Sequence, residues 1–352
     1  MTTTDFSATP HVPSVGEWNK AVASYRHASF KRSLWQITNS FVPFFVVYLA
    51  MYWLFSISAW LIVPLALLAG GFLIRIFIIF HDCGHGSFFK SHKANHVLGS
   101  ICGVLTWTPY FQWRHHHAVH HATSGDLDRR VGGELLPLTI AKYAKVSGNL
   151  LTLTVNEYKQ LSRWEKIVYR GYRNPLILFV FIPTLLFVVL NRTSDEGVGK
   201  RERQSVWGTN LALVVWCALF IWLFGFWAFV AVQGSILVIT SALGVWLFYV
   251  QHQFEETYWE HHEDWSYTEA ALEGSSFYQL PKVLQWFTGN IGFHHIHHLS
   301  PRIPNYYLEE CYAKNPMFQD ANVLTLRESL STIWVKLWDE DQKKMIGFAD
   351  VK

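Results

Sequence analysis

The stretch GFLIRIFIIFHDCGHGSFF, residues 71–89, joins the end of a long apolar run directly to His81 and His85. These two histidines are four positions apart, so on a helix they project from the same face. A run of about 20 apolar residues is long enough to cross a bilayer as a helix. The stretch therefore predicts a membrane-spanning helix, over about residues 59–80, that ends in a pair of imidazoles.

The composition of the whole chain agrees with a membrane location. Of the 352 residues, 51% are hydrophobic and only 16% are charged, against about 25% in an ordinary soluble domain. The net charge is only +3, so nucleic acid is not an expected partner. The cysteines lie far apart without CxxC spacing, which indicates free thiols rather than a disulfide framework or a thiolate metal site; they are Cys83, Cys102, Cys217 and Cys311.

Length and flanking charge separate six apolar stretches into two classes. The stretches 97–111 and 175–190 are short, and the second has basic residues on both sides. We expect both to form re-entrant or interface-lying helices. The other four are expected to cross the bilayer as two hairpins, at about residues 40–57, 59–80, 209–228 and 230–250.

Basic residues predict the orientation. Arg26, Lys31 and Arg32 precede the first span, which marks that side as cytoplasmic by the positive-inside rule. Four crossings return both termini to the same side. The chain is therefore predicted to be an all-α integral membrane protein with a cytosolic, histidine-rich cap. Its expected parts are a cytosolic N-terminal segment with an amphipathic helix over 1–39, a membrane domain over 40–304 and a cytosolic tail over 305–352.

Most of the eighteen histidines fall into clusters with helical spacing. Two copies of the pattern HxxHH follow the first pair, and one further histidine closes the last span. Residues at i, i+3 and i+4 share one helix face, and the parity of the crossings places all four groups at one membrane face. The nine candidate metal ligands are His81, His85, His117, His120, His121, His252, His294, His297 and His298.

Nine imidazoles exceed the needs of one metal ion. A catalytic zinc takes three protein ligands and a structural zinc takes four. Two ions, each with a position left for water or oxygen, would use the whole set. Neutral imidazole suits iron, zinc, copper and nickel, and the residues alone do not choose among them.

Several other polar residues lie near these clusters. His115, His116 and His295 fall outside the shared pattern and are expected to support the ligands or to face solvent. We expect surface positions for His11, His27, His92, His96, His261 and His262. Five carboxylates are candidates for orienting imidazole N–H groups, with ordinary surface charge as the alternative; they are Asp82, Asp126, Asp128, Glu255 and Glu256.

The histidine pattern around paired apolar hairpins resembles the membrane fatty acid desaturase family. The match extends beyond the histidines. Besides 71–89, the stretches VWLFYVQHQFEETYW (245–259) and GSSFYQLPKVLQWFTGNIGFHHIHHLSPRIPNY (274–306) are similar to bacterial acyl-lipid desaturases, most of all those of the Δ5 type.

This resemblance implies a non-haem enzyme of the bacterial cytoplasmic membrane that uses O2 to insert a cis double bond into a membrane-lipid acyl chain. The nine histidines would hold two iron ions. In structurally known relatives, an asparagine one turn before the fourth-group histidine holds a metal through water. Phe248 stands at that position here, so such a water would need another partner.

Reduction of O2 requires electrons from outside the chain. The sequence has no GxGxxG fingerprint and no CxxC cluster site, so no bound nucleotide or iron–sulfur cluster is expected. The residues before 40 are too few for a haem-binding, cytochrome b5-like extension, so no haem is expected either. The resemblance implies a separate ferredoxin- or flavodoxin-type donor. A basic set either docks such an acidic donor or is simply the positive-inside signal or an anionic-lipid site; it comprises Arg163, Lys166, Arg170, Arg173, Lys200, Arg201 and Arg203.

Three other functions compete with desaturation. Related di-iron enzymes hydroxylate lipids or alkanes with similar histidine clusters. An intramembrane zinc protease would need a glutamate beside His81, where the chain has Asp82. A metal transporter would place its ligands near the bilayer midplane rather than at one face. Neither the double-bond position nor the carrier of the acyl chain (lipid, CoA or acyl carrier protein) follows from the sequence.

Overall fold

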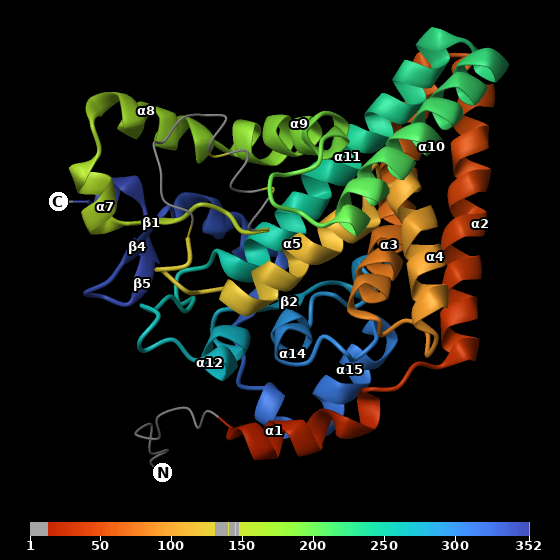
Figure 1. Ribbon diagram of the computed structural model, residues 1–352. Helices are drawn as coiled ribbons and strands as arrows, with labels where there is room; N and C mark the ends of the chain where they lie inside the picture. The colour runs from red at the N-terminus through yellow and green to blue at the C-terminus, as the bar shows by residue number, and fades with distance from the viewer. Residues whose placement is uncertain (1–12, 131–139, 141–144, 146–147, 352) are drawn as a thin grey trace, which may run out of the picture.

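The computed structural model describes residues 13–130, 140, 145 and 148–351, and two long helical hairpins dominate it (Figure 1). Among these residues, four helices are long and apolar enough to cross a membrane. The predicted all-α membrane fold with four spans is thereby confirmed. The four helices are α2 (Phe30–Phe55), α3 (Ile62–His85), which follows the short helix η2 (Ala59–Leu61), α10 (Lys200–Phe224) and α11 (Phe226–His252).

Local signals explain where these helices begin and end. The side chain of Ser29 accepts a hydrogen bond from the backbone N–H of Arg32 and caps α2, so this helix starts ten residues before the predicted span and runs across the expected domain boundary at residue 39. Gly86 ends α3 in the left-handed region, with φ of 69°. Gly225, with φ of 87°, alone forms the turn between α10 and α11.

Exposed tryptophans mark two levels along the hairpins. Trp35 and Trp53 lie on the outer surface of α2, 18 residues and therefore about 27 Å apart. This separation matches the hydrocarbon thickness of a bilayer, about 30 Å. Trp60, Trp222 and Trp227 are also exposed and lie at the hairpin tips, as expected for aromatic side chains at an interface. Both histidine-bearing helix ends, of α3 and α11, point away from these tips (Figure 1).

Arg75, the charged residue predicted within a span, is buried in α3. Its guanidinium donates to the backbone carbonyl of Trp286 and, at 3.4 Å, to Oδ1 of Asn39. The same group lies 4.0 Å from the centroid of the Trp286 ring. These contacts satisfy the buried charge and join the span to α13 (Lys282–Phe287).

The stretch predicted at 97–111 forms a helical excursion rather than a span. Helices α4 (His92–Leu105) and α5 (Tyr110–Thr123) each have 14 residues, about 21 Å, which is too short to cross. The chain turns back at Trp107, where φ is 55°. The Tyr110 hydroxyl donates to the carbonyl oxygen of Cys83 at 2.6 Å, which fixes the start of α5 against the end of α3.

The stretch predicted at 175–190 forms the second arm of a bent helix pair. Helix α8 (Arg163–Tyr172) and the helical run of η3 (Ile177–Phe181), α9 (Ile182–Val188) and η4 (Leu190–Arg192) meet at 62°. Figure 1 shows α8 and α9 lying across the direction of the hairpins. Exposed apolar side chains along it, such as Phe181, agree with a segment at the membrane surface.

The remaining elements form a cap at the end of the bundle opposite to the tips (Figure 1). Strand β1 (Leu153–Thr154) pairs in parallel with β4 (Leu337–Asp339), which pairs antiparallel with β5 (Lys344–Ile346); β2 (Phe277–Gln279) pairs in parallel with β3 (Val323–Thr325). The helices of the cap are α1 (Val15–Val22), η1 (Ala23–Tyr25), α7 (Val155–Gln160), α12 (Tyr267–Leu272), α13, α14 (His294–Leu299), α15 (Asn305–Lys314), η5 (Pro316–Phe318), α16 (Leu326–Ser329), η6 (Leu330–Trp334) and η7 (Phe348–Asp350).

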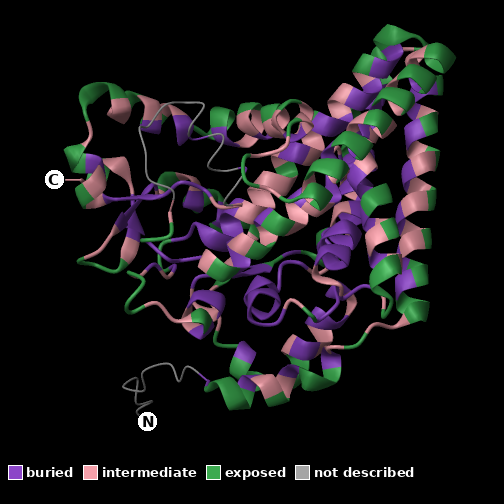
Figure 2. Ribbon diagram, in the orientation of Figure 1, coloured by how far each residue is buried: buried purple, intermediate pink, exposed green. Residues whose placement is uncertain are grey.

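The second HxxHH helix lies inside this cap. Every residue of α14 is buried, and Figure 2 shows it enclosed by other elements. Trp18 of α1, Leu308 of α15 and Phe318 pack in one apolar cluster with Ile296 of α14. The segments predicted as separate N-terminal and C-terminal parts therefore share a core with the histidine helix.

Gly103 allows the close turn between α4 and α5. A Cβ atom on Gly103 would lie 2.5 Å from the backbone oxygen of Thr108 and 3.3 Å from the Phe80 ring. We expect Gly103→Ala to destabilise the fold by about 1–3 kcal/mol, as overpacking of a filled site does. The measurement is the thermal unfolding midpoint in detergent.

The matched control is Gly208→Ala, where a Cβ would meet no atom within 4 Å on the exposed face of α10. That variant should be as stable as the parent or more stable, because Ala exceeds Gly in helix propensity by about 1 kcal/mol. Equal midpoints for both variants would contradict the assigned packing.

Candidate metal centre

Four elements bring the predicted histidines to one place at the cap end of the bundle. The end of α3 supplies His81 and His85, and the end of α11 supplies His252. One HxxHH pattern lies on α5 and the other on α14. Within the described residues, the nine predicted ligands divide into two groups whose nitrogen atoms converge.

The first group contains five imidazoles whose ligand atoms all lie within 4.8 Å of one another: His81, His85, His117, His121 and His297. The Nε2 atom of His117 is 3.0 Å from that of His85 and 3.2 Å from that of His121. The Nε2 atom of His297 lies 3.1 Å from that of His121. Three helices thus contribute to a single ring of nitrogens.

The second group contains four buried imidazoles that meet the same criterion: His120, His252, His294 and His298. The Nε2 atom of His120 is 3.1 Å from that of His298, and the Nε2 atoms of His294 and His252 are 3.0 Å apart. Neighbours in sequence belong to different groups, as His120 and His121 do, so the two groups lie side by side.

These separations fit nitrogens around metal ions. With metal–nitrogen bonds of about 2.1 Å, adjacent ligands at right angles are about 3.0 Å apart and opposite ligands about 4.2 Å apart. The observed contacts and the 4.8 Å limit agree with both values. The residues present therefore fit two metal ions, one with five and one with four imidazole ligands.

Burial favours the neutral form of imidazole, which is the form that binds metal. Loss of hydration lowers the pKa of His120 to about 4. The pKa values of the other α5 and α14 ligands lie well below the ordinary value, for the same reason and because the imidazoles face one another; these residues are His117, His121, His294, His297 and His298.

Three of the imidazoles have a partner for the second ring nitrogen. Nδ1 of His81 lies 3.2 Å from Oδ1 of Asp82, and the other carboxylate oxygen of Asp82 accepts hydrogen bonds from the backbone N–H and the side-chain amide of Asn305. Nδ1 of His120 lies 2.6 Å from Oδ1 of Asn149. Nδ1 of His252 faces the carbonyl oxygen of Gly274 at 3.2 Å.

Two of these partners were missed by sequence reasoning. Asn149 follows the first HxxHH by almost 30 residues without a recognisable spacing. The Gly274 contact is made by a backbone carbonyl, and every residue type has one, so the sequence cannot indicate it. Partners of this kind hold the ring in one orientation and fix its tautomer. Asp82, by contrast, was expected in this role.

The four other carboxylates predicted as partners contact different groups. Asp126 Oδ2 lies 2.8 Å from Nδ1 of His262, and Asp128 Oδ1 lies 2.9 Å from Nδ1 of His261. Glu255 pairs with Lys344 at 3.1 Å, and Glu256 is exposed. Their closeness in sequence to the ligands does not bring them to the ligands, because the chain leaves the helices at these points.

The histidines outside the pattern are exposed or make contacts with other groups. His115 is exposed. His116 is buried with Nε2 3.0 Å from Oδ2 of Asp195, whose other oxygen lies 2.7 Å from the Lys145 ammonium. Nε2 of His295 donates to the carbonyl oxygen of Phe318 at 3.0 Å. Of the predicted surface histidines, His27, His92, His261 and His262 are exposed, His96 is half-buried and His11 lies outside the described residues.

The basic set does not form one surface. Arg173 is fully buried and donates to Oε1 of Gln253, so this residue cannot dock a partner. Lys200, Arg201 and Arg203 are exposed at the start of α10, and the guanidinium of Arg201 lies 3.9 Å from the Phe111 ring centroid.

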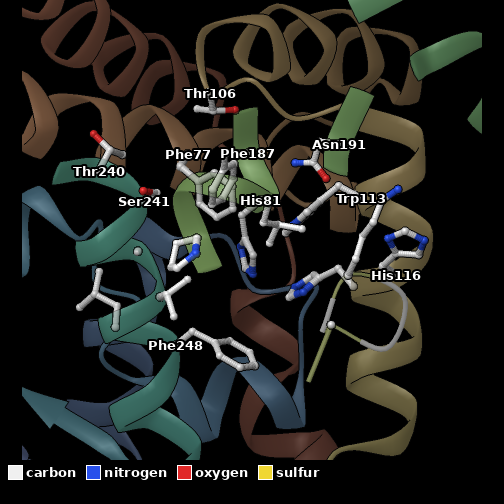
Figure 3. Close-up of a pocket in the computed structure, with 18 of the residues that line it drawn as sticks. Phe77, His81, Thr106, Trp113, His116, Phe187, Asn191, Thr240, Ser241 and Phe248 are labelled. Atoms are coloured by element: carbon white, nitrogen blue, oxygen red, sulfur yellow. The ribbon is translucent and has the colours of Figure 1, made fainter. Parts of the chain in front are cut away.

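A cavity of about 240 Å³ touches both histidine groups. It lies among α3, α5, α9 and α11, and His81 (Figure 3), His117 and His294 form part of its wall. The rest of the wall is mostly apolar, with polar side chains such as His116 and Asn191 on one side. An apolar cavity beside a pair of metal sites can hold a hydrocarbon chain next to them and exclude water.

Phe248 closes the cavity beside the four-imidazole group. It lines the cavity, and its ring centroid lies 5.1 Å from that of His120 and 4.9 Å from that of His252. An apolar ring therefore occupies the position at which the resemblance placed a water-binding asparagine.

Comparison with known proteins assigns the chain to a family. The family model described as fatty acid desaturase matches residues 58–329. A fatty acid desaturase of Bacillus subtilis (strain 168) is 47% identical over 333 residues, which cover 95% of this chain and 90% of the relative.

More distant relatives carry more specific names. An sn-1 oleoyl-lipid 12-desaturase of Picosynechococcus is 26% identical, covering 74% of this chain and 71% of the relative. An sn-1 acyl-lipid omega-3 desaturase (ferredoxin) of Synechocystis is 28% identical, covering 72% and 67%. The extent of the family match, which includes all nine converging histidines, shows that the chain belongs to the fatty acid desaturase family.

Proposed function

We propose that the protein is an acyl-lipid desaturase that inserts a cis double bond into the acyl chain of a membrane lipid, using O2, two bound iron ions and electrons from a separate donor. The observation that carries the proposal is the position of the nine imidazoles. They form a five-membered and a four-membered group, and each group contributes at least one imidazole to the wall of an apolar cavity between membrane helices.

The chemistry of the substrate explains this arrangement. Hydrogen on an unactivated methylene is beyond the reach of acid–base side chains, and iron with O2 supplies the oxidising power when bound. The chain's own residues bind the substrate and orient the metal-binding imidazoles. Side chains of α3 and α11 surround the hydrocarbon and exclude water, while Asp82, Asn149 and the Gly274 carbonyl hold three imidazoles in place.

The overall reaction needs an electron donor. Conversion of two methylenes to a cis double bond releases two hydrogen atoms. With two further electrons and two protons, these reduce O2 to two water molecules. No nucleotide fingerprint or cluster motif occurs in the sequence, so we propose a ferredoxin- or flavodoxin-type protein as the donor. The name of the Synechocystis relative includes ferredoxin, which supports this choice.

The position of the cavity supports a lipid substrate. It lies between spans of the two hairpins and the bent segment at α9, so an acyl chain can enter it from the bilayer. Basic residues at the starts of α2 and α10, among them Lys31, Arg32 and Arg203, are at the histidine end. By the positive-inside rule, we propose that this end and both termini face the cytoplasm of a bacterial cell.

Expression in a bacterial host that lacks unsaturated fatty acids tests the proposal. We expect lipid acyl chains that are two mass units lighter than their saturated precursors, because desaturation removes two hydrogen atoms. Mass spectrometry of the intact lipids provides the measurement. Products heavier by one oxygen would instead indicate hydroxylation, and unchanged lipids in the presence of inserted, iron-loaded protein would refute the proposal.

Adjacent histidines of α14 test the division into two groups. His297 belongs to the five-imidazole group and His298 to the four-imidazole group. We expect either His297→Ala or His298→Ala to lose one of the two irons and to abolish product, while the protein still inserts. Iron per chain, determined by elemental analysis, is the primary measurement.

The control for this pair is His295→Gln in the same helix. His295 contacts the Phe318 carbonyl rather than either group, and a glutamine amide can donate the same hydrogen bond. This variant should keep both irons. Loss of iron from it to the same degree as from the two alanine variants would contradict the assignment of ligands.

Asn149 tests the role of the orienting partners. We expect Asn149→Ala to lower iron affinity or turnover by about 10–100-fold, the usual effect of removing such a partner. Asp128→Asn serves as the control, because Asp128 is near the ligands in sequence but contacts His261 in the structure. Competition with an iron chelator measures the affinity, and equal effects of the two substitutions would show that the Asn149 contact is unimportant.

A further inference from the structure

The glycines within α3 have a packing reason. A Cβ atom would lie 3.0 Å from Ile239 if added to Gly70, 2.9 Å from Phe287 at Gly71 and 2.8 Å from Trp113 at Gly84. Membrane helices use small residues in this way to approach one another closely. These glycines are therefore explained by contacts between helices.

Gly244 has no such neighbour. A Cβ atom on Gly244 would meet no heavy atom within 4 Å, although the residue lies in the interior of α11. Glycine at a helical position costs about 1 kcal/mol relative to alanine. Gly244 also lines the cavity that touches the histidines, so the space beside it is part of this cavity.

The position of Gly244 along α11 relates it to the metal centre. Ser241, Gly244 and Phe248 are spaced three and four residues apart, lie on one helix face and all line the cavity. Gly244 precedes His252 by eight residues, or about 12 Å along the axis. The wall of the cavity is therefore without a side chain two turns from the four-imidazole group.

The polar lining indicates which part of a substrate passes this point. Figure 3 shows His81 between Ser241 on one side and His116 on the other. His116 is accompanied by Lys145, which also lines the cavity and pairs with Asp195. On the α11 side the polar lining residues nearest Gly244 are Thr240 and Ser241, which carry neutral hydroxyls, whereas the His116 side has an ion pair beside it. The ester end of an acyl lipid fits the His116 side, so the hydrocarbon beyond the reacting carbons extends along α11 past Gly244.

On the basis of the proposed function, we propose that Gly244 determines the length of acyl chain that the enzyme accepts. The missing side chain leaves room for the methyl-terminal part of a long chain. An added Cβ atom at this position enters that room without displacing any protein atom, and a larger side chain fills more of it. Selectivity between long and short substrates is then set by the bulk at residue 244.

The experiment compares Gly244→Val with Gly234→Val in the same helix. A Cβ at Gly234 also meets no atom within 4 Å, but Gly234 does not line the cavity. The two variants thus carry the same change in helix propensity. Both are supplied with an equal mixture of lipids bearing myristoyl, palmitoyl or stearoyl chains, and the desaturated products and the iron content are measured.

We expect Gly244→Val to lower the ratio of stearoyl to myristoyl product by about 5–100-fold. This is the equivalent of about 1–3 kcal/mol of overpacking at 1.4 kcal/mol per factor of ten. Gly234→Val should change the ratio by less than about twofold, as a surface substitution does. Both variants should retain parental iron, and Gly244→Ala should have a smaller effect in the same direction.

An unchanged ratio in Gly244→Val, or an equal change in Gly234→Val, would overturn the inference. So would loss of iron from both Gly244→Ala and Gly244→Val, because the residue would then be structural. Failure of the parent protein to desaturate any lipid is a different result, since it rejects the proposed function itself.

Discussion

The structure depends on the convergence of nine imidazoles, seven of them buried. The Nε2 atoms that face one another carry lone pairs when the imidazoles are in the metal-binding form, and buried acceptors without partners are costly. Contacts of 3.0–3.2 Å between Nε2 atoms are the spacing that a shared cation stabilises. The same cluster is therefore both the candidate metal centre and the junction of α3, α5, α11 and α14.

The membrane spans place some of the histidines at a common level. Helices α3 and α11 each follow a tight turn at a hairpin tip and run in the same direction, so the bilayer thickness fixes the level of His81 and His252. The remaining ligands must reach that level from outside the spans. Tyr110 and Gly103 lock α5 against α3, and the apolar cluster around Ile296 holds α14 inside the cap. The spans and the two helices packed against them thus bring together ligands that no single helix could supply.

Much of the fold and most of the candidate site were predictable from the sequence, for reasons of periodicity. Apolar length identifies four spans, i,i+4 spacing pairs His81 with His85, and the parity of crossings places His252 beside ligands more than 100 residues away. Helix ends were less predictable, because Ser29 and Gly225 act through local hydrogen bonding and backbone conformation. Proximity in sequence failed for Asp126 and Asp128, whose partners lie on another loop.

The shape of the cavity cannot be predicted from the sequence pattern. Its histidine wall follows from pattern, but its apolar wall combines single residues from α3, α5, α9 and α11, each with its own packing constraints. Part of that wall lacks a side chain, since Gly244 contributes only backbone. A glycine in an apolar helix has the same letter whether it permits close helix contact, as Gly70 does, or leaves space for a ligand. Only the positions of the neighbouring atoms separate the two cases. The spacing of the histidines can therefore be recognised in the sequence, whereas the space beside Gly244 can be recognised only in the structure.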